Sequence, residues 1–391
     1  MSSINFGPAV LRTVPFSEPG CRPLRRRASA PELADANKIH ENASPSYQAG
    51  NTVRLHLMSR LVQATIIRTF TPFTMAPVMV VRIFEPAIDL EGDFVLKVYD
   101  RRYSTEARDE EGDNNAWTVA RDMGFEKRRW SSDFVKFFLH LMSSQHLDDT
   151  GDDFWDEEDE EDSESTGDEE EGLADAYTEM YFQVQCLKMY RAETEFYRRA
   201  REHHIDGVDI PRFISSVRIP PSYTSKYHHT QSSHIKGIPG VLLQYVPGFS
   251  MLRLYDTSSP PPPGPEHWKS IIDDGLRTVQ YYMQNMEILN MDQNIARNTV
   301  VHWDPIGEKW KCKLIDFGHC QFRAKNMRKW EWRSCQAGLQ EEAAVGRFMQ
   351  AMLEKNTGFQ YRWEQSQYSD ELARDFRGEF STGIEPSDYP S

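Results

Sequence analysis

Cysteine is scarce in this sequence of 391 residues, and long apolar runs are missing. The five cysteines form no Cys-x-x-Cys pair and no regular framework, which excludes a disulfide-stapled fold and predicts a reducing compartment, cytoplasmic or nuclear. No apolar run reaches the roughly 18 residues that a membrane span requires, and no apolar segment follows the basic residues near the N-terminus. We therefore expect neither a membrane association nor a secretory signal. The cysteines are Cys21, Cys186, Cys312, Cys320 and Cys335.

Basic residues are absent from one long stretch, Asp148–Glu171, which holds 16 acidic residues. Removing those 16 from the 60 acidic residues of the chain leaves 44, against 45 Lys and Arg. The net charge of −15 thus belongs to this segment, and the rest of the chain gives no reason to expect a nucleic-acid partner. So many like charges with few apolar residues cannot offset the entropy of ordering, so we predict a disordered acidic insert over about residues 147–173. Ser163, Ser165 and Thr166 are candidate phosphosites within it, and a solubilising loop is the alternative.

The first 52 residues show no hydrophobic periodicity and are predicted to form a disordered tail. Three consecutive arginines, Arg25 to Arg27, precede Ser29 and Pro31. A basophilic kinase could phosphorylate Ser29, and the phosphate could then dock an adaptor protein. An ordinary basic tail is the alternative.

Strand-like runs follow, at residues 61–70, 77–84 and 94–99, and two more at 210–217 and 240–245. The third run, Phe94-Val95-Leu96-Lys97-Val98-Tyr99, places a lysine within an apolar strand. A buried ammonium needs a partner of opposite charge. Lys97 is therefore a candidate site residue, unless it lies on the solvent-facing side of a sheet.

Apolar residues at helical spacing predict helices over about residues 134–142, 174–203, 266–286 and 341–354. The second of these carries Glu193 and Glu195 near its middle, and the fourth has Glu341 at its start. Further on, Leu314 and Ile315 lead out of a short apolar strand into Asp316-Phe317-Gly318. That arrangement presents a carboxylate at the end of a strand.

The ordered set Val95-Leu96-Lys97, Arg297-Asn298 and Asp316-Phe317-Gly318 resembles protein kinases, and the run from Leu96 to Arg102 looks like fungal protein-kinase-like proteins. The resemblance implies an α+β, two-lobed protein-kinase-like fold. Residues 53–250 would form an N-terminal lobe with an antiparallel sheet plus one helix. Residues 251–391 would form a reduced helical C-terminal lobe and tail.

The same resemblance implies site residues for ATP and Mg²⁺. Lys97 would hold the α- and β-phosphates, and Glu193 would orient it, with Glu195 in reserve. Asp292 would be the catalytic base, and Asn298 and Asp316 would bind the metal ion. The remaining expected residues form the hinge that contacts adenine: Gln244, Tyr245 and Val246.

Three departures leave the function open. No glycine lies between Leu61 and Ile83, so the glycine-rich loop that covers the phosphates is missing. Asn298 lies one position further from Asp292 than the kinase pattern requires, so either the loop holds an extra residue or Gln293 occupies the base position. An Ala-Pro-Glu segment is also absent. Two hypotheses remain: phosphoryl transfer from Mg-ATP to an unidentified protein or small-molecule substrate, and a catalytically impaired pseudokinase that acts as a binding module.

Overall fold

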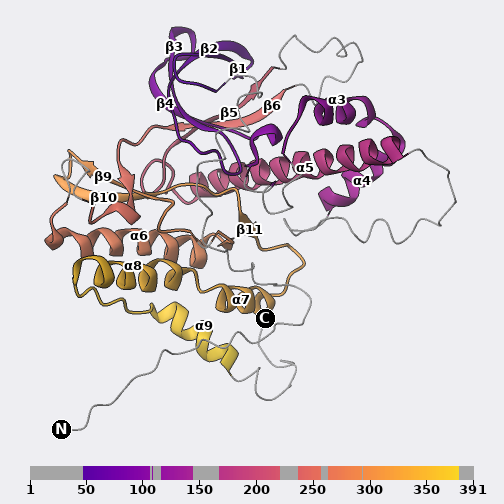
Figure 1. The fold of residues 1–391 in the computed structure, drawn as a ribbon. Helices are drawn as coiled ribbons and strands as arrows, with labels where there is room; N and C mark the ends of the chain where they lie inside the picture. The colour runs from indigo at the N-terminus through magenta and orange to yellow at the C-terminus, as the bar shows by residue number, and fades with distance from the viewer. Residues whose placement is uncertain are drawn as a thin grey trace, which may run out of the picture.

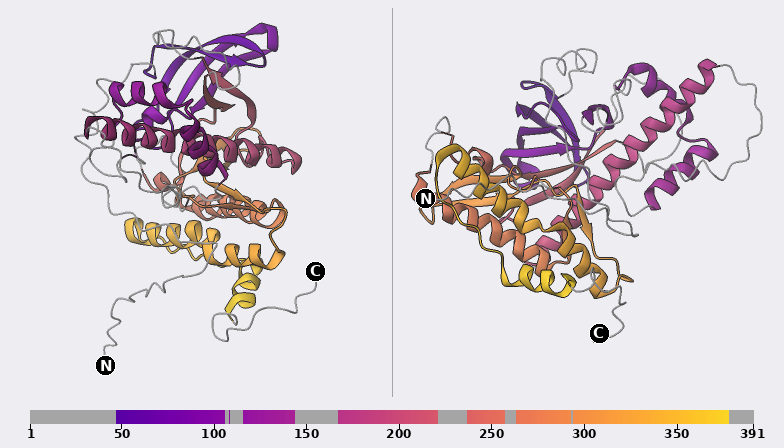
Figure 2. Two further views of the ribbon diagram at one scale, coloured as in Figure 1. Left: turned by 90° about the vertical axis from the view of Figure 1, so that its right-hand side faces the viewer. Right: turned by 60° about the horizontal axis from the view of Figure 1, so that its bottom comes forward.

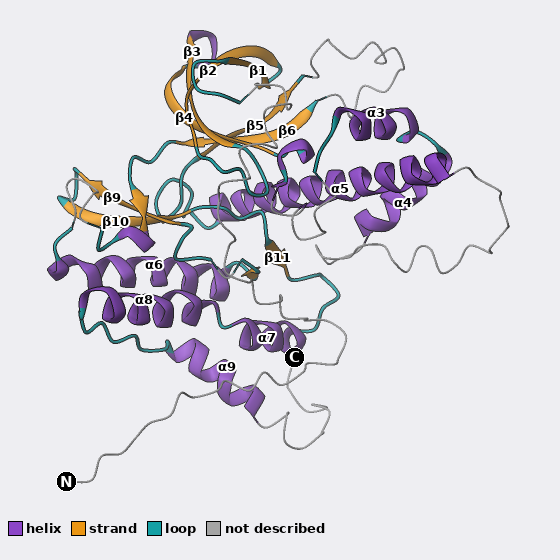
Figure 3. Cartoon of the chain, in the orientation of Figure 1, coloured by secondary structure: helices purple, strands orange, loops and turns teal. Residues whose placement is uncertain are grey.

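The computed structural model describes residues 47–105, 108, 116–143, 167–220, 237–256, 263–292 and 294–377 (Figures 1 and 3). Ser29, with the proposed adaptor site, and residues 147–166 of the predicted acidic insert lie outside this part of the chain. Residues 167–173 of that insert form the first turns of helix α5. Among the described residues, no helix combines the length and apolarity needed to cross a bilayer.

Six antiparallel strands form a closed barrel in the order β1-β2-β3-β4-β6-β5. Alternating burial along β1 and β2 shows how the sequence builds it, because every second side chain points inward. β1 and β2 are joined by Met58 and Ser59, both with positive φ (48° and 66°), as in the tight turns that suit hairpins. The strands are β1 Thr52–Leu57, β2 Arg60–Thr69, β3 Val78–Glu85, β4 Leu90–Val98, β5 Phe213–Ile219 and β6 Ile238–Gln244.

The closed barrel shows that the prediction of a two-lobed protein-kinase-like fold is wrong. The N-terminal lobe of that fold is an open sheet, whereas here β1 pairs with β5 and removes both edges. The register places His56 opposite Arg218 and Leu57 opposite Val217. Closure satisfies backbone groups that an open edge would leave unpaired. Alternation along a strand gives its inward face but not its distant partner, so this pairing could not be derived from the sequence.

Helix α5, Gly167–Glu202, is 36 residues long, and its C-terminal end lies beneath the barrel in the view of Figure 1. Figure 1 shows two shorter helices, α3 Val119–Arg128 and α4 Ser132–Ser143, along its N-terminal half. They pack on it through their own apolar cluster, and Figure 2 shows the same grouping from two other sides. The buried members of the cluster are Phe125, Phe134, Phe137, Leu141, Ala176, Met180 and Val184.

The C-terminal half of α5 enters the largest core, which it shares with helices from the second half of the chain. Two small sheets lie between these helices and the barrel: β10-β9-β7 and β11-β8. The helices are α6 Pro265–Asn285, α7 Lys329–Leu339, α8 Glu341–Thr357 and α9 Gln367–Arg377. The strands are β7 Phe249–Ser250, β8 Ile288–Asn290, β9 Thr299–Asp304, β10 Lys309–Leu314 and β11 Cys320–Phe322. The described residues also include three short 3₁₀ helices: η2 Pro86–Ile88, η3 Arg101–Tyr103 and η5 Met251–Arg253.

Candidate functional site

Lys97, Glu193 and Asp316 meet although they come from three separate elements. The Lys97 Nζ on β4 donates to Glu193 Oε2 of α5 at 2.7 Å. The same nitrogen donates to Asp316 Oδ1, in the segment after β10, at 2.5 Å across 219 positions of sequence. The order of the motifs along the chain predicted this grouping, and the structure brings the three side chains together.

Burial sets the electrostatics of this cluster. The Lys97 and Glu193 side chains are 7% and 0% exposed, whereas that of Asp316 is 38% exposed. Burial opposes the charged ammonium, but the carboxylates of Asp316 and Glu193 outweigh it and raise the pKa of Lys97. Burial likewise disfavours the charged form of Asp316, but Lys97 outweighs it and lowers the pKa of that carboxyl. One ammonium between two carboxylates leaves an excess negative charge on the more exposed side, at Asp316.

Tyr99 is a fourth member of the cluster that the sequence did not reveal. Its hydroxyl donates to Glu193 Oε2, the oxygen that also accepts from Lys97. The sequence does contain a signal for it: Tyr99 lies two positions after Lys97, and residues two apart on a strand share a face. The other carboxylate oxygen of Glu193, Oε1, is buried without a hydrogen bond from any described residue. Burial raises the pKa of Tyr99, as does the neighbouring Glu193 carboxylate, so the phenol remains a donor.

Glu195, the reserve for Glu193, lies on another side of α5. Its carboxylate accepts from Arg198 at 2.7 Å and from Arg199 at 2.8 Å. These arginines lie on the same helix, within a turn, and hold the pKa of Glu195 down to about 2. Glu195 therefore joins a surface charge pattern of the helix, and Glu193 is the glutamate that meets Lys97.

The Asp316-Phe317-Gly318 turn is fixed by its aromatic residue. Phe317 is buried and stacks on Phe196 of α5, with ring centroids 3.5 Å apart. Gly318 packs close to Met189 of α5, where an added Cβ would lie 3.2 Å from the Met189 methyl. Asp316 has φ +66°, a left-handed conformation that non-glycine residues adopt at a cost and that often marks functional sites. Anchoring the neighbouring residues on α5 holds the carboxylate toward Lys97.

Asp292 and Asn298 are brought together by the turn between them. Asn298 Nδ2 donates to Asp292 Oδ2 at 2.8 Å. The loop lies against the Asp316 segment, because the Ile315 N–H donates to the Asn298 carbonyl at 2.8 Å and the Met291 N–H donates to the His319 carbonyl at 3.1 Å. The turn therefore keeps the two side chains in contact although they are six positions apart. Gln293, the alternative base, lies outside the described residues.

Glu341, at the start of α8, holds the beginning of this loop. Its Oε1 accepts from the backbone N–H of Asn290 and, at 3.4 Å, from the Tyr282 hydroxyl. Burial raises the pKa of this carboxyl well above its ordinary value. The Asn290 side chain in turn accepts from the Asp292 N–H at 3.0 Å. The two acceptors fix the backbone that carries Asp292.

The expected hinge residues lie at the end of β6, which pairs with the strand of Lys97. Val241 is opposite Lys97, and Gln244 is opposite Phe94, three positions further along. The structure therefore does not bring Gln244 into the Lys97 cluster, and its side-chain oxygen accepts from the Arg212 N–H at 3.2 Å. Within the described part of the chain, the backbone groups of Tyr245 and Val246 make no hydrogen bond.

The loop between β2 and β3, residues 70–77, is held against the chain that follows β4. The Thr105 hydroxyl donates to the Phe73 carbonyl, and the Ser104 hydroxyl donates to the Met75 carbonyl at 3.1 Å. Phe73 is buried edge-to-face against Tyr103, with ring centroids 5.6 Å apart. This loop leads into the strand position opposite Lys97, since Val78 pairs with that lysine.

The donors fit a magnesium ion that is shared with a ligand. The described residues contain no group of three or more His, Cys, Asp or Glu side chains that could hold a metal ion. Mg²⁺, however, typically takes only one or two protein oxygens and completes its shell with phosphate and water. Asp316 Oδ2 accepts no hydrogen bond from Lys97, and the carboxylate is partly exposed, so its chemistry suits such a ligand; the Asn298 amide oxygen would be the second.

Comparison of the sequence with models of protein families finds no match, and neither does comparison with curated proteins.

Proposed function

We propose that this protein binds Mg-ATP at the Lys97 cluster and transfers the γ-phosphoryl group to a hydroxyl of a protein or small-molecule substrate. The observation that carries the proposal is the buried ammonium of Lys97 between Glu193 and Asp316. A lysine held in this way can exchange one carboxylate for phosphate oxygens while the other carboxylate still pairs with it. The support comes from the chemistry of the site and the resemblance of its motifs, because fold does not determine function.

Each side chain has a distinct role in this proposal. Lys97 binds the phosphate oxygens, and Glu193, with the Tyr99 hydroxyl, orients the ammonium. Asp316 and Asn298 would hold Mg²⁺, which when bound would neutralise charge on the transferred phosphoryl group. The unpaired backbone groups of Tyr245 and Val246 are available for the edge of the adenine ring.

Asp292 is the proposed base. The hydroxyl oxygen of the substrate forms a bond to the γ-phosphorus while the bond to the bridging β–γ oxygen breaks, and ADP leaves with that electron pair. The hydroxyl proton passes to Asp292, whose Oδ2 is held 2.8 Å from Asn298 Nδ2. Positioning and charge neutralisation supply most of the rate in such reactions, and proton transfer to Asp292 would add about 100-fold.

A second candidate function is nucleotide binding without transfer, as in a pseudokinase that recruits partners. Two observations favour it. The loop at residues 70–77 contains no glycine and is tied to the chain at residues 103–105. Both carboxylate oxygens of Asp292 already accept hydrogen bonds, Oδ1 from the Asn294 N–H at 2.8 Å and Oδ2 from Asn298. Such a protein would bind Mg-ATP but leave the γ-phosphate intact.

Thermal unfolding with and without Mg-ATP tests the binding step, because a ligand that binds only the native state raises the melting temperature. We expect a rise with millimolar Mg-ATP in the wild type and none in Lys97→Met. Lys313→Met is the matched control: Lys313 is also buried, but its ammonium donates to the carbonyls of Gly207 and Val208, both at 2.7 Å. That variant should keep the rise.

Release of labelled phosphate, or its transfer to a substrate, separates the two candidates. Turnover that is lost in Asp292→Asn supports phosphoryl transfer. Binding without any turnover supports the pseudokinase. An unchanged melting temperature in the wild type at millimolar Mg-ATP would reject both.

A further inference from the structure

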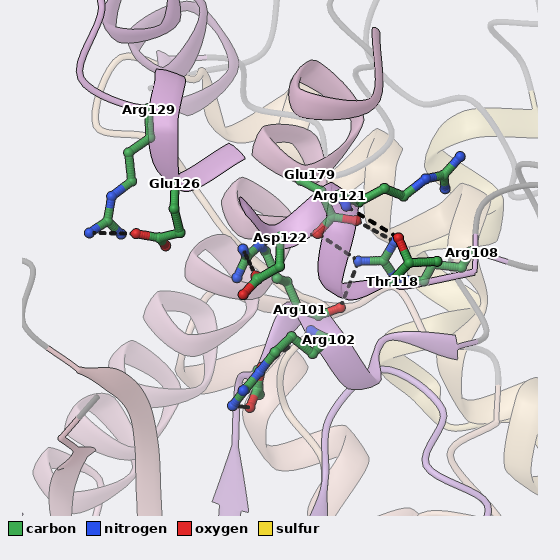
Figure 4. Close-up of polar contacts among 10 residues, drawn as sticks. Arg101, Arg102, Arg108, Thr118, Arg121, Asp122, Glu126, Arg129 and Glu179 are labelled. Atoms are coloured by element: carbon green, nitrogen blue, oxygen red, sulfur yellow. Dashed lines mark hydrogen bonds and ion pairs between the residues drawn. The ribbon is translucent and has the colours of Figure 1, made fainter. Parts of the chain in front are cut away.

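A second buried carboxylate lies on α5, away from the proposed nucleotide site. Glu179 is fully buried and accepts two hydrogen bonds from Arg108, at 2.7 and 2.9 Å. Arg101 Nε lies 3.2 Å from the same carboxylate, and Arg101 also pairs with Asp122 of α3 (Figure 4). Arg108 additionally donates to the Arg101 carbonyl at 3.1 Å. Both arginines thus contact Glu179, and Arg108 also binds the backbone of Arg101.

Both arginines belong to the segment that continues the strand of Lys97. Arg101 opens η3, directly after β4, and Arg108 follows it. Glu179 precedes Glu193 on α5 by about four helical turns, or roughly 21 Å, which returns it to nearly the same face of the helix. Helix α5 is therefore joined to one continuous segment at two points: Glu193 to Lys97, and Glu179 to Arg101 and Arg108.

The charges and geometry of this second joint resist displacement of the helix. Two guanidinium groups are balanced by two carboxylates, Glu179 and Asp122. The guanidinium of Arg101 lies 4.3 Å from the ring centroid of Phe125, and that of Arg108 lies 4.2 Å from that of Phe182. A bidentate arginine–carboxylate pair fixes direction as well as distance. Because the groups are buried, salt screens them little.

We propose that Glu179, Arg101 and Arg108 form a positioning cluster that fixes the register and rotation of α5 against the β4 segment and thereby keeps Glu193 on Lys97. A rotation of α5 by one residue, about 100°, would carry Glu193 away from the ammonium. These are positioning residues, because they act through Glu193. The effect on ATP rests on the proposed function, whereas the effect on the Lys97–Glu193 pair does not.

The first test measures the reactivity of the Lys97 amine toward acetic anhydride, with the acetylated lysines located by mass spectrometry. Glu179→Gln keeps the size of the side chain but removes its charge. If α5 shifts, the Lys97 ammonium loses the Glu193 carboxylate and becomes accessible to the reagent. Its acylation should then rise, by about tenfold for each 1.4 kcal/mol of lost interaction. Acylation of Lys313 should be the same in the variant and the wild type, because its partners, the carbonyls of Gly207 and Val208, lie outside α5. A parallel rise at Lys313 would report general opening of the fold.

Glu195→Gln is the matched control on the same helix, because among the described residues the ion pairs of Glu195 are with Arg198 and Arg199 of α5 itself. It should leave Lys97 as unreactive as in the wild type. Arg108→Lys keeps the charge but loses the bidentate geometry, so it should give a smaller rise than Glu179→Gln. It also serves as the test variant if Glu179→Gln does not fold.

The second readout is Mg-ATP affinity, measured from the rise in melting temperature across a titration. We expect Glu179→Gln to weaken it by about five- to tenfold, as remote positioning residues do, and Glu195→Gln to leave it unchanged. Higher Lys97 reactivity in a protein whose wild type does not bind Mg-ATP would support the positioning cluster and reject the proposed function. A folded Glu179→Gln variant with unchanged Lys97 reactivity would overturn the positioning cluster.

Discussion

Replacing Lys97 by methionine should destabilise the fold by about 3–5 kcal/mol, because one partner of a buried ion pair is left without the other. The Lys97 and Glu193 side chains are 7% and 0% exposed, with 2.7 Å between Nζ and Oε2. Methionine fills most of the space of the lysine stem, so cavity formation adds little. Asp316 is 38% exposed and can be hydrated when the ammonium is removed. Losing the Lys97–Asp316 contact therefore contributes little to the destabilisation.

The size of this destabilisation should depend on pH in a definite way. A lysine with a raised pKa contributes stability that is fully present below its unfolded value, about pH 10, and is lost as pH rises through the folded value. A carboxyl with a lowered pKa, here Asp316, contributes stability that is present above about pH 4 and is lost as pH falls through its folded value. The difference between wild type and Lys97→Met should therefore be largest between these limits.

Urea unfolding of the wild type, both single variants and the double variant Lys97→Met/Glu193→Gln measures the pair directly. Each single change removes one contact of the other group, although Lys97 keeps Asp316 and Glu193 keeps the Tyr99 hydroxyl. The double variant should therefore lose less than the sum of the two, with a coupling of about 1–3 kcal/mol. If the free energy of unfolding falls with urea concentration at the same slope in all four proteins, their unfolded states expose similar surface. A Lys97→Met variant within about 1 kcal/mol of the wild type, or strictly additive effects, would refute the reasoning.

Four further predictions concern the surroundings of the cluster. Burial raises the pKa of the Glu341 carboxyl, so this group should make the wild type less stable as pH rises above about 4. Glu341→Gln should not show this decrease, and unfolding at several pH values checks it. Burial lowers the pKa of Lys313 to about 8, so wild-type stability should rise relative to Lys313→Met between about pH 8 and 10; parallel curves would contradict it. Phe317→Ala should cost about 3–5 kcal/mol by calorimetry, through loss of the stacked ring on Phe196. Asp292→Asn should lower ATP turnover by about 100-fold while Mg-ATP binding, measured separately, persists.

The central triad was predictable because each member has a local signature. Lys97 interrupts an apolar strand, Asp316 follows another before Phe-Gly, and Glu193 lies within a long amphipathic helix. Burial of a charged residue requires partners, so three such positions in one chain favour a common site. The resemblance favoured Glu193 over Glu195, and the arginines one turn from Glu195 show that Glu195 has other partners.

The remaining features depend on contacts that no local pattern encodes. Closure of the barrel rests on β1 and β5, whose pairing joins His56 to Arg218 across the sequence. The contacts of Glu179 with Arg101 and Arg108 depend on how α5 lies against the end of β4. The contact between Asp292 and Asn298 could not be derived from their spacing alone, since turns of different lengths can bring two side chains together.

Reaction with an acyl phosphate of ATP tests most directly whether Lys97 binds the phosphates, because such a reagent acylates a lysine beside the bound nucleotide. Mass spectrometry should locate the label on Lys97, and excess Mg-ATP should prevent it. Labelling of other lysines only, or labelling of Lys97 that persists in excess Mg-ATP, would contradict the proposed nucleotide site.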